Sequence, residues 1–237
     1  MESLRDIFWS LQKSADKWDP YFDVYETWLE RFRGRSPRIL EVGVQNGGSA
    51  EMWLRYFGPG TKIVGIDIDQ RCLQHANTDV EVVIGDQGDP VFWDKFFAEH
   101  TEPFDIIIDD GGHRMNQMIL TFIAASPHVK PNGVYVIEDV HTAYWNHYTI
   151  FWPGPWDDHG LYNTNNIMEF TKVGLDVLNR EHIEPHGNLI PQLDPTVRDT
   201  FKHVKATHYY NSQIVFEIGP QTEFKRCVNS GAKMAED

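Results

Sequence analysis

The alternation of five short runs rich in Ile and Val with segments of helical spacing constrains the fold more than any other feature of this chain. Apolar runs of this length are typical of strands that are buried on both faces of a parallel sheet. The sequence therefore predicts a doubly wound α/β sheet with right-handed crossovers. The expected strands are Arg38–Gly43, Lys62–Asp67, Val80–Gly85, Phe104–Asp109 and Val134–Glu138, and the expected helices are Ser49–Phe57, Gln70–Ala76, Pro90–His100 and Met115–His128.

The pattern changes after Asp139. An aromatic stretch with Pro and Gly, residues 140–165, is expected to form a functional loop, because loops of this length seldom serve only as connections. A helix is expected from about residue 165 to residue 182. Two further runs, Val204–Tyr210 and Gln213–Ile218, are separated by only two residues and predict a closing hairpin, with an antiparallel strand at one edge of a seven-stranded sheet.

Size and composition favour one globular domain over residues 1–237. Residues 1–35 carry an aromatic stripe with helical spacing, which includes Trp18 and Tyr25 and is expected to pack on the sheet. Residues 220–237 are polar and are expected to form a loose tail.

Charge and cysteine usage exclude several classes of function. The chain has 21 Lys and Arg against 35 Asp and Glu, a net charge of −14, and no basic stripe, so nucleic acid is not an expected partner. Its two cysteines have no metal-ligand spacing and form no disulfide framework. No stretch approaches the apolar length of a membrane span, and the amino terminus does not resemble a signal peptide. A cytoplasmic protein is expected.

Polar and glycine residues follow the first three strands, where an open parallel sheet binds its ligands. Gly43, Gly47 and Gly48 allow a tight turn and a close approach to a ligand, and Asp67 at the end of the second strand suits the two hydroxyls of a ribose. Gln45 breaks the G-x-G-x-x-G pattern of dinucleotide sites, whereas E-x-G-x-x-x-G is seen in S-adenosylmethionine sites. The glycines alone are equally consistent with a structural turn, and so is Asp86 after the third strand.

Four carboxylates and a histidine follow the fourth and fifth strands. Carboxylates so close together repel one another unless a cation or shared protons intervene. Oxygen ligands favour Mg²⁺, Mn²⁺ or Ca²⁺ over Zn²⁺. Each single residue is also consistent with a helix cap or an ordinary ion pair, and the histidine with a packed ring. The residues are Asp109, Asp110, His113, Glu138 and Asp139, of which Asp110, Glu138 and Asp139 are the expected ligands and His113 the expected base.

Several blocks of the sequence resemble the metal-dependent sugar O-methyltransferases typified by the mycinamicin sugar enzyme, a family similar in fold to cephalosporin hydroxylase-like proteins. The blocks are ILEVGVQNGGSAEMW, GIDID, IGDQGD, FDIIIDDGGH and GVYVIEDVHTAYW, which together cover about Arg38 to Trp145. The combination of DDGGH with VIEDVHTAYW is the most specific. The resemblance implies a Rossmann-like class I methyltransferase fold, S-adenosylmethionine as cofactor, and Mg²⁺ or Mn²⁺.

The resemblance also implies roles for individual residues. The expected metal ligands are Asp110, Glu138 and Asp139. His113 is the expected general base, with Asp110 and His141 as further catalytic residues, although His141 stands where a large aromatic residue is expected. Trp145, Trp152, Trp156 and Tyr162, in or beside the loop, are candidates for stacking on a sugar or for core packing. The resemblance assigns cofactor binding to Glu41, Gly43, Asp67 and Asp86, and the further expected cofactor-binding residues are Gly47, Ser49, Gln87 and Asp109.

The function that this resemblance implies is methyl transfer to a sugar hydroxyl of a glycoside, oligosaccharide or polysaccharide precursor. With a short amino-terminal region, the chain is expected to lack the auxiliary domain of the larger macrolide enzymes, which favours a compact relative, such as the enzymes that methylate mycobacterial mannose polysaccharides. A homo-oligomer, either a dimer or a tetramer, is expected. The alternatives are a catechol-type O-methyltransferase and a cofactor-binding protein without catalysis. An iron hydroxylase is more remote, because a site with two histidines and one carboxylate is not evident.

Overall fold

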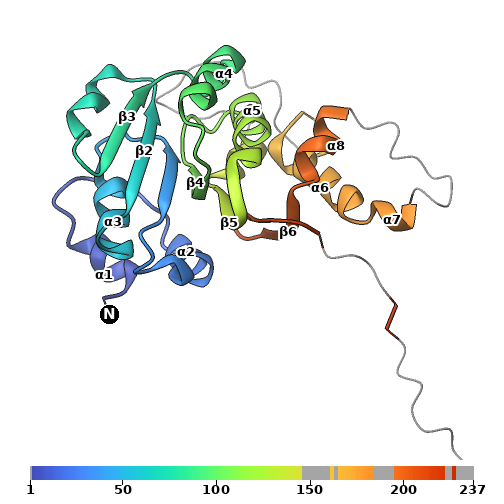
Figure 1. Cartoon of the computed structure of the whole chain (residues 1–237), viewed down its shortest axis with the longest axis horizontal. Helices are drawn as coiled ribbons and strands as arrows, with labels where there is room; N and C mark the ends of the chain where they lie inside the picture. The colour runs from blue at the N-terminus through green and yellow to red at the C-terminus, as the bar shows by residue number, and fades with distance from the viewer. Residues whose placement is uncertain (1, 146–160, 163–164, 184–194, 222–225, 228–237) are drawn as a thin grey trace, which may run out of the picture.

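The computed structural model describes residues 2–145, 161–162, 165–183, 195–221 and 226–227. Its described part contains a seven-stranded mixed sheet with the strand order β3-β2-β1-β4-β5-β7-β6 (Figure 1). Strands β1 to β5 are parallel, so their carboxyl ends meet at one edge. The strands are β1 Arg38–Val42, β2 Lys62–Asp67, β3 Val80–Ile84, β4 Phe104–Asp109, β5 Val129–Ile137, β6 Val204–Tyr209 and β7 Ile214–Ile218.

The expected α/β alternation is confirmed, with small differences at the ends of elements. β5 begins at Val129, earlier than expected, because Val129 pairs with Phe104 before a register shift. The segment 70–75 is a 3-10 helix, η2. Helix α5 ends at Ala125, two residues before Pro127, which cannot donate to a helical hydrogen bond. The remaining elements between the parallel strands are α3 Gly48–Phe57, α4 Pro90–Glu99 and the 3-10 helix η3 Ser126–His128.

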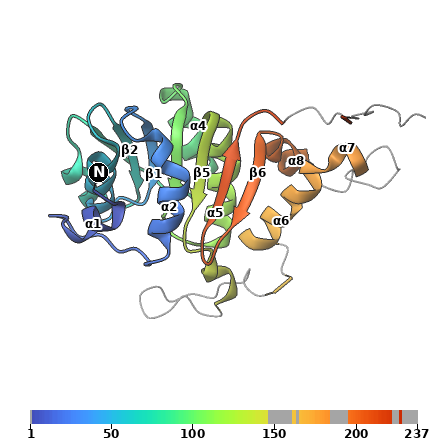
Figure 2. The ribbon, with the colours of Figure 1, turned by 90° about the horizontal axis from the view of Figure 1, so that it is seen from below.

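Two hydrophobic clusters pack on the two faces of the sheet. Successive residues of β1 point to opposite faces, and Ile39 belongs to one cluster whereas Leu40 belongs to the other. The Ile39 cluster holds the buried apolar residues of the helices α1 Leu4–Trp9, α2 Tyr21–Leu29 and α3, and the Leu40 cluster holds those of α4, α5 (Met115–Ala125) and α6 (Ile167–Leu178). In the ribbon, α2 and α5 lie on opposite sides of the sheet (Figure 2). The amino-terminal stripe thus packs on the sheet as expected, and η1 (Glu30–Phe32) leads from α2 toward β1.

The carboxyl-terminal part closes the sheet with the expected hairpin. β7 lies between β5 and β6 and is antiparallel to both. The helix expected over residues 165–182 is divided at Asn179 into α6 Ile167–Leu178 and α7 Arg180–Ile183, and it begins at an N-cap, Asn166, whose side chain accepts from the backbone of Glu169. A further helix, α8 (Pro195–Phe201), precedes β6.

The loop expected over residues 140–165 lies only partly within the described chain. It opens with a 3-10 helix, η4 (Val140–Tyr144). Trp152 and Trp156 lie outside the described residues, as does most of the tail expected over residues 220–237. Among the described helices, none is both long enough and apolar enough to cross a membrane.

Candidate active site

The glycine loop after β1 is packed so closely that its glycines have no room for a side chain. Gly43 has φ +99°, and a Cβ there would lie 2.0 Å from the carbonyl oxygen of Asp110 at the end of β4. Gly47 has φ +72° and caps α3, and a Cβ there would lie 2.8 Å from the ring of His75. The loop therefore lies between the end of β4 and the helix η2, and only Gln45 and Asn46 at its tip are exposed.

Asp67, at the end of β2, holds this loop. Its Oδ2 accepts hydrogen bonds from the backbone N–H groups of Val44 and Gln45, both at 2.9 Å. Its Oδ1 accepts from the N–H of Asp69 at 2.9 Å. Gln45 has φ +46°, which is uncommon for a residue other than glycine. Asp67 thus fixes the backbone conformation of the glycine loop. The sequence had led us to expect that this side chain binds a ribose beside the loop.

Glu41 is a buried carboxylate inside β1. Its side chain is 1% exposed, and its Oε1 accepts a hydrogen bond from the indole N–H of Trp53 at 2.9 Å. Its Oε2 has no hydrogen-bond partner within the described chain. Burial raises the pKa of Glu41 to about 7, against the opposing effects of Lys17, Trp53 and Ser49. A buried polar atom without a partner costs free energy, so this oxygen fits a donor group of a bound ligand.

The residues after β3 play two different structural roles. Asp86 is exposed and closes a turn by accepting from the N–H of Gly88 at 2.7 Å. Gln87 is buried, donates to Asp109 Oδ1 at 3.0 Å and accepts from the N–H of Gly112 at 2.6 Å. Burial raises the pKa of Asp109 to about 7, and its Oδ2 lacks a partner among the described residues. Gln87 and Asp109 therefore brace the ends of β3 and β4 against each other.

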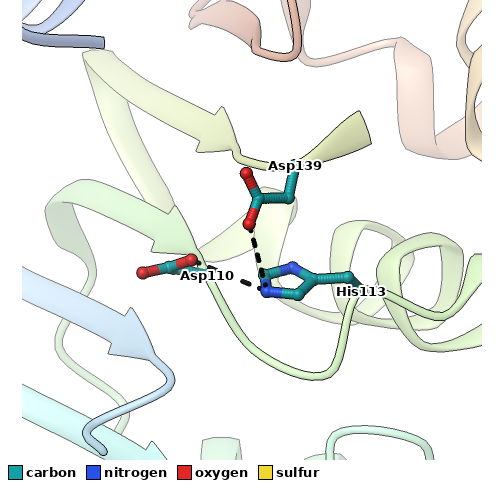
Figure 3. A group of neighbouring side chains, drawn as sticks. All are labelled: Asp110, His113 and Asp139. Carbon is teal, nitrogen blue, oxygen red and sulfur yellow. Dashed lines mark ion pairs between the residues drawn. The ribbon is translucent and has the colours of Figure 1, made fainter. Parts of the chain in front are cut away.

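Asp110, His113 and Asp139 form a cluster at the ends of β4 and β5 (Figure 3). The Nε2 atom of His113 lies 3.4 Å from Asp139 Oδ2 and 3.9 Å from Asp110 Oδ1. One donor atom from each residue lies within 4.8 Å of the others. His113 has φ +53° and Asp139 has φ +55°, and left-handed backbone at residues other than glycine is frequent at functional sites. The two carboxylates of this cluster offer the oxygen ligands that a hard divalent cation such as Mg²⁺ or Mn²⁺ prefers.

Glu138, the third expected ligand, lies deeper and is bound to the amino-terminal segment. Its Oε2 accepts from the ammonium of Lys17 at 2.8 Å, and its Oε1 accepts from the hydroxyl of Tyr25. Lys17 also pairs with Asp110, and its side chain is only 2% exposed. The hydroxyl of Tyr21 donates to Asp139 Oδ1 at 2.6 Å. Each of the three expected metal ligands is thus bound by a side chain from residues 17–25.

This environment changes the pKa values of the buried pair. Burial alone would lower the pKa of Lys17, but Asp110, Glu138 and Glu41 outweigh it and raise that pKa. Burial, with the charge of Asp110, raises the pKa of Glu138. The roles of Lys17, Tyr21 and Tyr25 were not predicted from the sequence. The signal it offered was two tyrosines four positions apart on one helix face, because a buried tyrosine hydroxyl usually needs a partner.

His141 lies beside the cluster. Its Nδ1 forms a hydrogen bond with the hydroxyl of Ser212 and lies 3.9 Å from Asp139 Oδ1. Burial lowers its pKa. The rings of Trp18 and Trp145 contact the His141 ring edge-on, at centroid distances of 5.8 Å and 4.3 Å. Trp18 and Trp145 are 56% and 40% exposed, so aromatic surface flanks the carboxylates.

Comparison with known proteins agrees with this geometry. Residues 40–140 match the model of a methyltransferase domain. The 8-demethyl-8-alpha-L-rhamnosyl tetracenomycin-C 2'-O-methyltransferase of Streptomyces olivaceus is 32% identical over 204 residues, which cover 82% of this chain and 51% of the relative. Demethylmacrocin O-methyltransferase of Streptomyces fradiae is 33% identical over 207 residues, which cover 84% of this chain and 48% of the relative.

A solved structure matches almost the whole chain. It is the MycE methyltransferase from the mycinamycin biosynthetic pathway in complex with Mg and SAH, with a TM-score of 0.75, 27% identity, and coverage of 94% of this chain and 56% of that one. The chain spans about half the length of the curated relatives it matches. The Rossmann-like methyltransferase fold and the resemblance to sugar O-methyltransferases are thereby confirmed.

Proposed function

We propose that this chain, which carries a methyltransferase domain, transfers a methyl group from S-adenosylmethionine to a sugar hydroxyl of a glycoside, oligosaccharide or polysaccharide precursor, with Mg²⁺ or Mn²⁺. One observation carries the proposal. Gly43 of the glycine loop lies directly against the backbone of Asp110, so a cofactor on the loop would sit beside the cluster of Asp110, His113 and Asp139. The names of two relatives, which state O-methylation of a rhamnosyl group and of demethylmacrocin, support it.

The residues of the glycine loop would hold the cofactor. Gly43 and Gly47 allow the tight backbone of this loop, and Asp67 keeps that backbone in place. The free oxygen of Glu41 fits an ammonium or hydroxyl group of the cofactor. The same proposed site includes Ser49, Asp86, Gln87 and Asp109. Of these, Gln87 and Asp109 are buried and would support the site by joining the ends of β3 and β4.

The ion would be held by Asp110 and Asp139, with Glu138 as the third ligand of the proposal. When bound, the ion supplies positive charge that lowers the pKa of a nearby sugar hydroxyl. One solved structure of MycE contains mycinamycin VI together with Mg and SAH. This complex supports a sugar-bearing acceptor at such a site.

His113 would act as the general base. As the methyl carbon leaves sulfur and bonds to the sugar oxygen, the hydroxyl proton passes to the imidazole of His113. Asp139, whose Oδ2 lies 3.4 Å from His113 Nε2, would orient the ring and stabilise its charged form. His141, Trp18 and Trp145 would line the acceptor side, where aromatic faces suit the apolar face of a sugar ring.

Labelled S-adenosylmethionine tests the proposal. A panel of glycosides and catechols is incubated with the protein after chelation, with and without added Mg²⁺ or Mn²⁺. We expect label on glycosides, loss of turnover after chelation, and recovery with the ion. His113→Ala should abolish transfer while S-adenosylhomocysteine still binds. Label on catechols alone would establish the catechol-type alternative, and cofactor binding without any transfer would establish a binding protein.

We further propose a single domain over residues 1–237, with residues 140–165 as the acceptor loop and residues 220–237 as a tail. The location would be the cytoplasm, and the assembly would be a homo-oligomer, either a dimer or a tetramer. Light scattering after size-exclusion chromatography measures the assembly, and a monomeric mass would contradict it.

A further inference from the structure

We propose that the ammonium group of Lys17 and the divalent ion compete for the same carboxylates, so that ion binding releases the segment 12–18 from the sheet edge. The inference rests on the proposed function, because it requires an ion at Asp110 and Glu138. Lys17 lies outside the sequence motifs of the site, and the inference gives it the role of a cation that occupies the carboxylates before the divalent ion binds.

The charges at the site support this competition. Lys17 pairs with Asp110 and with Glu138, and both oxygens of Glu138 are bound, one by Lys17 and the other by Tyr25. An ion that takes an oxygen from either partner of Lys17 would lie within a few ångströms of the ammonium, and two cations that close repel strongly in a site of low dielectric. Lys17 and the ion therefore cannot both occupy the centre of the site without a large penalty.

The position of the segment links this exchange to the cofactor loop. The backbone N–H groups of Gln12 and Lys13 donate to the carboxylate of Glu51 on α3, at 2.9 and 3.0 Å. A Cβ on Gly48 would lie 2.3 Å from the carbonyl oxygen of Ser14, so the segment crosses the start of α3. Gln12, Lys13 and Ser14, which make these contacts, are exposed, and residues 12–18 form neither a helix nor a strand.

Because Lys17 is buried, cleavage by trypsin after this residue directly measures the release of the segment. Trypsin cleaves after lysine only when the side chain can enter the protease, and the Lys17 side chain is 2% exposed. In the wild-type chain we expect Mg²⁺ to accelerate cleavage after Lys17 by about tenfold or more. Cleavage after Arg71 is the control for effects of Mg²⁺ on the protease, because the Arg71 side chain is 86% exposed and pairs with Asp69, far from the cluster in sequence.

Metal affinity provides the second measurement. Lys17→Met keeps the apolar stem and removes the charge, and Lys17→Gln keeps a neutral donor. Lys13→Met is the matched control, since Lys13 lies in the same segment and is exposed. In titrations of Mn²⁺ followed by electron paramagnetic resonance, both Lys17 variants should bind Mn²⁺ about tenfold more tightly than the wild type and Lys13→Met.

The outcomes separate this inference from the proposed function. Equal Mn²⁺ affinity in all four proteins, or weaker affinity in the Lys17 variants, would overturn the competition while leaving the metal site intact. Unchanged protection of Lys17 from trypsin in the presence of saturating Mg²⁺ would also overturn it. If none of the proteins binds Mn²⁺ while S-adenosylhomocysteine still binds, the metal part of the proposed function fails and the inference fails with it.

Discussion

The two halves of the carboxyl edge of the sheet are built in different ways. On the cofactor side, the polar residues find partners close in sequence, as Asp86 does with the backbone two residues later and Asp67 with the loop 22 to 23 residues before it. On the ion side, Asp110 and Glu138 are bound by Lys17, which lies 93 and 121 residues away. The first half is completed by neighbouring βα units, whereas the second depends on docking of the amino-terminal segment.

This difference predicts different sensitivities. The cofactor half should fail when its own backbone is disturbed, because little else supports the loop. Without a bound ion, the ion half should lose stability when a distant donor is removed, because that donor is a hydrogen-bond or ion-pair partner of a carboxylate at the site. The halves meet at Gly43, where the loop of β1 touches the end of β4.

The largest effect is expected at this junction. Gly43→Ala places a Cβ 2.0 Å from the backbone of Asp110 at φ +99°, so both the loop and β4 must move. We expect a loss of about 4 kcal/mol or more in the free energy of unfolding, the range of the most damaging single substitutions, and loss of S-adenosylhomocysteine binding. Urea unfolding and calorimetry measure the two effects.

Gly34→Ala is the matched control, because Gly34 also has a positive φ, +72°, but nothing lies within 4 Å of its added Cβ. It should cost only about 1–2 kcal/mol, the price of left-handed backbone. Equal losses for the two variants would show that the contact between the halves does not matter.

The sequence predicted the cofactor half better than the ion half for a physical reason. Runs of Ile and Val and the positions of glycine and aspartate at strand ends report local structure, and Asp67, Gly43 and Gly47 lie at the loop as expected. The predicted strand ends also brought Asp110, His113 and Asp139 together. The ion pair of Lys17 with Glu138 depends on where a segment without regular structure crosses the sheet. The path of such a segment cannot be predicted from the spacing of apolar residues in the sequence.

The next effect is a dependence of stability on pH that arises from Glu41. Its pKa is about 7 in the folded protein against an ordinary 4.5, because it is buried. Below the ordinary value, both states hold the proton. As pH rises toward 7, the unfolded chain loses the proton first, so folding is progressively destabilised, by about 3 kcal/mol in total.

Glu41→Gln should remove this component, since the amide oxygen still accepts from Trp53. The free energy of unfolding in urea, measured at pH 5 and pH 8, should fall less in the variant than in the wild type, with the exposed Glu99→Gln as the control. Saturating S-adenosylhomocysteine should reduce the difference if Glu41 faces the ligand. An identical pH dependence in the wild type and Glu41→Gln would contradict this account of the cofactor half.

The smallest effect tests the distant donors of the ion half. Tyr25→Phe removes the hydroxyl that donates to Glu138 Oε1 and leaves a buried carboxylate oxygen without that donor, which should cost about 2 kcal/mol. Tyr135→Phe is the matched control, because the Tyr135 ring is also fully buried but its hydroxyl has no partner within the described chain. Its removal should be neutral or slightly stabilising. If urea unfolding shows equal changes in the two variants, Tyr25 contributes only as a packed ring, and the long-range support of the ion half reduces to Lys17 and Tyr21.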